Sequence, residues 1–360
     1  MTKQLRSGYT TGACAAAAAK AAALLLKHGE APTGVEIPFP DHSRHSFWVH
    51  QALMLNDGAR ASVIKDAGDD PDVTNGAEIG AVVRYRYEDT AQRECCIQLD
   101  TVELCGGAGV GFASKPGLAV AVGEPAINPV PRQMIADAVR EVIADKQLHV
   151  EIFIHQGLAL AQKTLNRRLG IIGGLSVLGT TGIVRPVSAD AWTATIKASM
   201  NVARKAGLDE VVLSTGRTSE RGAQSELDLP EEAYAMMGDY LEFSLKEAAR
   251  QGFVKIHLAA MWAKITKAAL KVPQTHVRNG ALEMKDAAGL LADLGAEGEL
   301  LQKIKNANTA REMHEHLHHG KRQDIIRAVC QLAQDYGREV TGKAVEVYLV
   351  NSKAEVIEHV

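Results

Sequence analysis

The stretch LGIIGGLSVLGTTGIVRPVS, from Leu169 to Ser188, constrains the fold more than any other part of the chain. Its first half is almost continuously apolar, which is typical of a strand covered on both faces. Its second half is a loop whose glycines permit positive φ or close approach to a ligand, and whose threonines offer hydroxyl groups to an anion or a ribose. This pattern predicts a small-molecule site, and a purely structural turn is the alternative. The loop consists of Gly179, Thr180, Thr181 and Gly182.

Strands and helices alternate in the second half of the chain. Such alternation predicts a mostly parallel, Rossmann-like sheet with helices on both faces, a three-layer α/β domain. The first half has many strands but few helices, which favours an α+β domain. We therefore expect an α/β protein with domains at 1–150 and 151–360. In the second domain the expected strands are 171–178, 210–214, 253–259, 345–350 and 354–358, with helices at 189–206, 231–250, 260–271 and between 284 and 337.

Ligands of parallel sheets bind beyond the carboxyl ends of the strands. Three loops are expected there: 179–186, 214–222 and the segment that reaches 275–280. Several cationic side chains in these loops would suit a ligand with carboxylates or phosphates, although each could equally be solvated. The cationic candidates are Arg185, Arg217, Arg221, His276 and Arg278.

The first domain contributes a helix and an acidic loop. The alanine-rich segment between Thr10 and Gly29 predicts a helix whose amino-terminal amides are free to face a ligand, with Cys14 either a nucleophile or a small buried residue. The loop from Asp66 to Thr74 carries four carboxylates. It could hold a metal, bind a cationic group, or form a solvated turn whose side chains cap backbone amides.

Composition excludes several classes of protein. A net charge of −3 and dispersed basic residues argue against nucleic acid or an anionic membrane as partner. No stretch approaches the length of a membrane span. The five cysteines are odd in number and no secretory signal is visible, which predicts reducing cytoplasm and no disulfide framework. Zinc is not expected, because CxxC pairs are missing and the histidines at 314–319 are better explained as a solvated helix end.

Several longer stretches together resemble the CbiD family, the cobalt-precorrin-5B C(1)-methyltransferases. They are SGYTTGACAAAAAKAA at 7–22, VIKDAGDDPDVTNGAEI at 63–79, KPGLAVAVGEPAINPVPR at 115–132, KTLNRRLGIIGGLSVLGTTGIVRPVS at 163–188 and ANTARE at 307–312. The resemblance implies methyl transfer from S-adenosylmethionine to carbon 1 of a cobalt-containing corrinoid, giving cobalt-precorrin-6A in anaerobic cobalamin synthesis. It implies no protein-bound metal and leaves room for a homo-oligomer.

The resemblance also suggests roles for the candidate residues. The donor would lie against Gly179, Thr180, Thr181 and Gly182 together with Ser214, Thr215 and Gly216, and the corrinoid against Arg185, Arg217, Arg221, Asp66 and Asp69. His276 is the candidate general base, if one is needed. The sequence STGRTSE at 214–220 departs from the STPGNYGRD of many members, so the contacts of this loop stay open.

Two other functions remain as alternatives. One is a phosphate- or nucleotide-handling enzyme that uses the glycine-rich loops and a magnesium ion on the Asp66–Asp72 loop, although the Walker lysine spacing is missing. The other is a non-catalytic corrinoid carrier.

Overall fold

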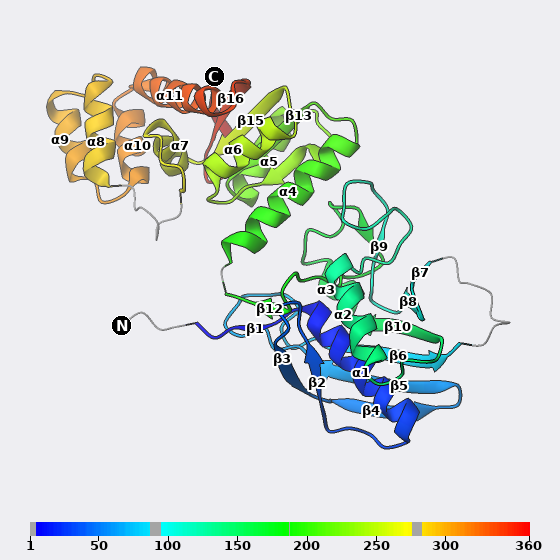
Figure 1. The fold of residues 1–360 in the computed structure, drawn as a ribbon. Coiled ribbons are helices and arrows are strands. Elements are labelled where there is room, and N and C mark those ends of the chain that lie inside the picture. The colour runs from blue at the N-terminus through cyan, green and yellow to red at the C-terminus, as the bar shows by residue number, and fades with distance from the viewer. Residues whose placement is uncertain (1–4, 87–94, 187, 276–282) are drawn as a thin grey trace. The chain divides into compact units, whose positions relative to one another are not determined.

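The computed structural model describes residues 5–86, 95–186, 188–275 and 283–360, and these form two compact units (Figure 1). Unit 1 comprises Met1–Ala189 and unit 2 comprises Asp190–Val360. The division therefore falls well after the expected boundary at 150. The reason is that the intervening segment pairs with unit 1: β11 (Ile171–Ile172) with β9 (Phe112–Ala113), and β12 (Ile183–Val184) with β1 (Gly8–Tyr9).

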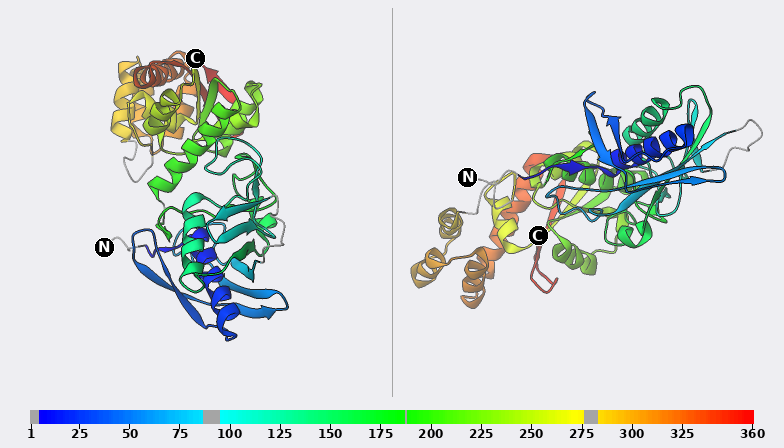
Figure 2. Two further views of the ribbon diagram at one scale, coloured as in Figure 1. Left: turned by 45° about the vertical axis from the view of Figure 1, so that its right-hand side comes forward. Right: turned by 90° about the horizontal axis from the view of Figure 1, so that it is seen from below.

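Helix α1 (Thr11–His28) is the centre of unit 1 and confirms the expectation from its alanines. Thr10 caps it by accepting a hydrogen bond from the amide of Ala13, and Gly29 ends it in the left-handed conformation at φ 75°. Its alanines are almost completely buried, and the helix packs against α2 (Pro129–Arg140) and one face of a six-stranded sheet (Figure 2). Small side chains allow this close approach on several sides of the helix.

The sheet of unit 1 is mixed. Its strand order is β4 (Gln51–Leu55), β5 (Gly58–Ile64), β6 (Glu78–Tyr85), β10 (Leu148–Ile154), β8 (Val102–Gly106) and β7 (Cys96–Leu99), and only β10 and β8 run parallel. Before β4 the chain forms β3 (Arg44–Trp48), which pairs with β2 (Gly34–Pro38) in a separate two-stranded sheet. A short helix, α3 (Gly157–Ala161), follows β10.

A disulfide links Cys96 of β7 to Cys105 of β8, contrary to the expectation from the cysteine count. The two residues face each other in the antiparallel pair. Their juxtaposition depends on the register of the strands, which cysteine counting does not reveal.

Unit 2 is the expected three-layer α/β arrangement. Its sheet order is β14 (Tyr234–Met236), β13 (Glu210–Ser214), β15 (Lys255–Ala260), β16 (Ala344–Val350) and β17 (Val356–His359), and only β17 is antiparallel. One face packs against α4 (Ala189–Lys205), α6 (Leu241–Arg250), α7 (Trp262–Ala269) and α11 (Gln323–Thr341), and the other against α5 (Arg217–Glu226). The described part of unit 2 also contains η1 (Glu231–Ala233), α8 (Met284–Asp293), α9 (Gly298–Asn306) and α10 (Ala310–His319).

Three local expectations are corrected. The strand expected at 171–178 is only β11, because Leu175 and Val177 make isolated bridges to Val110 and Ile127 inside unit 1. The segment 214–222 is not all loop, since α5 begins at Arg217. The segment 231–250 is not all helix, since it includes β14. Among the described residues, no helix combines the length and apolar character needed to cross a lipid bilayer.

Candidate functional site

Three segments that are distant in sequence meet at the start of α1. The amide of Thr10 donates to the carbonyl of Gly182 at 2.9 Å, and the amide of Gly12 donates to that of Leu178 at 3.1 Å. From the acidic loop, the carbonyl of Asp66 accepts from the amide of Tyr9 at 2.7 Å. The structure thus brings the acidic loop and the glycine–threonine loop together in unit 1.

These contacts use the amides that the sequence suggested were free. The amide of Ala13 donates to Thr10 Oγ1 at 3.1 Å, in addition to the bond from Gly12 to Leu178. The expectation of an open anion site at this helix start is therefore wrong for these two amides. Burial raises the pKa of the Cys14 thiol to about 12, which favours the buried over the nucleophilic role.

The two glycines of the 179–182 loop are explained by packing within the protein. Gly179 has φ +130°, and a Cβ there would lie 2.5 Å from the side chain of Thr10. Gly182 has φ +84°, and a Cβ there would lie 2.4 Å from the ring of Phe39. Their presence therefore needs no ligand, while the neighbouring Thr180, Thr181 and Arg185 are exposed.

The acidic loop is held by ion pairs and backbone contacts. Asp66 pairs with Arg6 at 2.5 and 2.8 Å, which lowers the pKa of Asp66 to about 2. Asp69 accepts from the amide of Arg6 at 2.8 Å. The buried Lys65 pairs with Asp72 at 2.6 Å, and Asp72 also accepts from the amide of Thr74 at 2.7 Å. These contacts match the capping alternative, and within the described residues the loop forms no metal-type cluster.

In unit 2, the expected ligand edge lies at the carboxyl end of β13. Counted within their sheet, the strands have the order 2-1-3-4-5, so the topology reverses between β13 and β15. Ser214 is buried and its hydroxyl donates to Glu220 of α5 at 3.2 Å, while Thr215 and Ser219 share a hydrogen bond of 3.2 Å. A Cβ added to Gly216 would meet no atom within 4 Å, so the turn is open in front of this residue.

Three further polar residues at this edge were not among the sequence candidates. Asp239 follows β14, and its carboxylate contacts Lys264 and accepts from Thr275 Oγ1 at 3.1 Å. Lys264 also donates to the carbonyl of Thr275 at 2.7 Å. Asp239 was missed because the strand before it was mistaken for a helix. The short apolar run YAMM, followed by glycine, was the available signal.

The candidate residues are divided between the two units. Gly179–Gly182, Arg185, Asp66 and Asp69 lie in unit 1, whereas Ser214–Gly216, Arg217 and Arg221 lie in unit 2. Arg217 and Arg221 are both exposed, one turn apart on α5. His276 and Arg278 lie outside the described residues.

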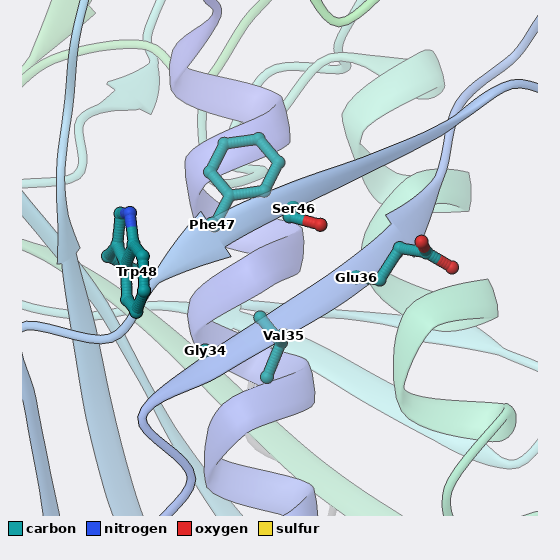
Figure 3. A pocket seen from close by; sticks show the side chains of 6 residues that line it. All are labelled: Gly34, Val35, Glu36, Ser46, Phe47 and Trp48. Atoms are coloured by element: carbon teal, nitrogen blue, oxygen red, sulfur yellow. The ribbon is translucent and has the colours of Figure 1, made fainter.

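A separate pocket of about 310 Å³ lies on the β2–β3 hairpin (Figure 3). It includes Trp48, whose side chain is prominently exposed, and none of the candidate residues. Its lining residues are Gly34, Val35, Glu36, Ser46, Phe47 and Trp48.

Comparison with known proteins covers both units. The CbiD family model matches residues 1–186, and the model of the CbiD C-terminal domain matches residues 274–359. The chain is 61% identical over 360 residues to a cobalt-precorrin-5B C(1)-methyltransferase of Desulfotalea psychrophila, covering 99% of this chain and 98% of that protein. It is 46% identical to the protein of the same name from Geobacter metallireducens, covering 94% of each.

A crystal structure of the cobalamin biosynthesis protein (cbiD) from Archaeoglobus fulgidus aligns with 88% of this chain and 85% of its own, with a TM-score of 0.39 and 22% identity. The family match extends over more than half of the chain, and the sequence identity to the Desulfotalea protein extends over almost all of it. The chain belongs to the CbiD family.

Proposed function

We propose that this protein transfers the methyl group of S-adenosylmethionine to carbon 1 of cobalt-precorrin-5B, giving cobalt-precorrin-6A in anaerobic cobalamin synthesis. The observation that carries the proposal is the 61% identity, over nearly all of both chains, to a relative named for this activity. The phosphate-handling alternative loses support, because Thr10 and Leu178 occupy two amides at the start of α1. A carrier without activity is disfavoured by the methyltransferase name of the relatives.

The donor is proposed to bind at the carboxyl end of β13. Ligands of open α/β sheets bind where the strand order reverses, and Ser214–Gly216 occupy that position. The open space in front of Gly216 suits close approach of a ligand to the backbone, whereas Thr10 and Phe39 fill the corresponding space at the 179–182 loop. Glu220 is a buried carboxylate next to this turn, suited to accept from the ribose hydroxyls or the amino group of the donor.

The corrinoid carries carboxylates and is proposed to contact arginines. Arg217 and Arg221 project from the helix that follows the donor turn, and Arg185 is exposed in unit 1. Asp66 and Asp69 remain proposed substrate contacts, and His276 remains the proposed base. When bound, S-adenosylmethionine supplies an electrophilic methyl group. The residues of the chain orient the two molecules in line and exclude water.

Anaerobic incubation with cobalt-precorrin-5B and methyl-labelled S-adenosylmethionine tests the proposal. We expect mass spectrometry to detect one labelled methyl group on the corrinoid and one equivalent of S-adenosylhomocysteine. Folded protein that binds the corrinoid without labelling it would identify a carrier instead. Hydrolysis of a nucleotide with magnesium, without methyl transfer, would favour the phosphate-handling alternative.

A further inference from the structure

Cysteine, glutamate and histidine side chains, which are types that can ligate a metal ion, lie together on the face of the unit 1 sheet opposite α1. Leu104 and Val150 point towards the helix and belong to its hydrophobic core. Side chains alternate along a strand, so Glu103, Cys105 and His149 point the other way. His149 faces Glu103 in register, and Cys105 faces Cys96. One ligand atom from each of Cys96, Glu103 and Cys105 lies within 4.8 Å of the other two.

The cluster is buried and polar. Glu103 is 3% exposed, Cys105 4% and His149 7%, while Cys96 is partly exposed. His149 Nδ1 lies 2.8 Å from Glu103 Oε2 and 3.7 Å from Cys105 Sγ. The other carboxylate oxygen, Glu103 Oε1, is buried without a hydrogen bond from the described residues, and Arg86 Nη2 approaches it only to 3.6 Å. A buried carboxylate oxygen in this position is short of partners.

We propose that reduction of the Cys96–Cys105 disulfide creates a binding site for a thiophilic divalent cation such as zinc, with Cys96, Cys105 and Glu103 as its ligands. Water fills the fourth position. His149 holds the carboxylate of Glu103 through their hydrogen bond and is a positioning residue. The disulfide and metal-bound forms exclude each other, because both use the same two sulfur atoms.

The site forms in two steps, which are reduction of the disulfide and binding of the cation. A small-molecule dithiol donates two electrons and two protons to the S–S bond, giving two thiols, and is itself oxidised to a disulfide. The cation then binds both sulfurs as thiolates, and two protons leave to solvent. Arg86 lies next to Glu103, so its positive charge offsets the net negative charge of two thiolates and one carboxylate around a divalent ion.

The donor set and the backbone geometry suit such a cation. Thiolate sulfur with one carboxylate oxygen is a ligand set that zinc accepts. The Cα atoms of Cys96 and Cys105 are 4.4 Å apart on adjacent strands, so rotation about the side-chain bonds can separate the sulfurs without displacing the strands. The partly exposed Cys96 gives the ion a route from solvent.

Cobalt(II) is the probe, because its absorption spectrum reports thiolate ligands and tetrahedral coordination. The full chain is reduced anaerobically, freed of reductant and titrated with cobalt(II). We expect one equivalent to produce a thiolate-to-cobalt charge-transfer band that zinc abolishes by displacement. The oxidised protein should show no band, and this control is independent of any effect of mutation on folding.

Variants separate this site from the other thiols. We expect Cys96→Ser and Cys105→Ser to lose the band, and Glu103→Gln to bind cobalt at least tenfold more weakly. Cys95→Ser should keep the band, since Cys95 is an exposed neighbour outside the cluster. Circular dichroism checks that each variant is folded. A band that survives in folded Cys105→Ser, or no band in the reduced wild-type protein, would overturn the proposal.

Discussion

Thr11 and Leu178, separated by 167 positions, exchange two hydrogen bonds through a single hydroxyl group. Thr11 Oγ1 donates to the carbonyl of Leu178 at 3.2 Å and accepts from its amide at 2.9 Å. This exchange ties the segment before the 179–182 loop to the first turn of α1. Substitutions in this loop should therefore affect the stability of unit 1 directly.

We expect Gly182→Ala to destabilise the protein. The residue has φ +84°, and the new Cβ would clash with the ring of Phe39. The left-handed conformation costs about 1 kcal/mol for alanine, and overpacking adds about 1–3 kcal/mol. Urea unfolding measures the difference. Gly173→Ala is the matched control, because it has φ +81° but open space, so it should show only the conformational cost. Equal losses for the two variants would contradict the packing explanation.

We expect Glu141→Gln to lower the free energy of unfolding at neutral pH and to make that free energy less dependent on pH in the acid range. Arg44 and then Lys20 lower the pKa of Glu141 from 4.5 to about 2. The unfolded state therefore binds more protons between these values, so the stabilisation is complete above pH 4.5 and is lost as the pH falls through 2. At neutral pH we expect a loss of about 2 kcal/mol, because Lys20 loses a charged partner. Urea unfolding from pH 7 to 3 measures both effects, and an unchanged acid slope would contradict them.

Glu220→Gln tests the proposed donor site. We expect the dissociation constant for S-adenosylhomocysteine to rise about tenfold, because a charge-assisted hydrogen bond becomes a neutral one. Isothermal titration calorimetry measures the affinity. Glu226→Gln is the control, since Glu226 is exposed at the far end of the same helix and should leave binding unchanged. If the two variants bind S-adenosylhomocysteine with equal affinity, the proposed donor site at the carboxyl end of β13 is wrong.

Arg185→Ala tests the proposed contact with the corrinoid. We expect S-adenosylhomocysteine affinity to stay as in the wild type, while kcat/KM for the corrinoid falls about tenfold through loss of a charged hydrogen bond. Arg338→Ala removes another exposed arginine, whose partner is Asp335 at 3.9 Å, and should have no such effect. Normal turnover by Arg185→Ala would show that this side chain is only solvated.

Local sequence patterns predicted many of the elements correctly. The alanines between Thr10 and Gly29 favour helix whatever surrounds them, so α1 was expected within a residue or two. The short apolar run before the turn at Thr215 and Gly216 gave β13 with its observed bounds. The alternation of strand and helix was sufficient to predict the parallel sheet of unit 2, because two parallel strands must be joined by a crossover connection, which is usually a helix.

Only the tertiary structure decided which segments meet. The apolar run 171–178 could be a buried strand or a buried loop by its composition, and its contacts with Val110 and Ile127 made it part of unit 1. Cys96 and Cys105 lack zinc-motif spacing, yet strand register brings them face to face. Hydrophobic periodicity depends on neighbours a few residues apart, so the sequence determined the local elements. Pairing between distant segments depends on which surfaces bury each other, and only the folded chain reveals it.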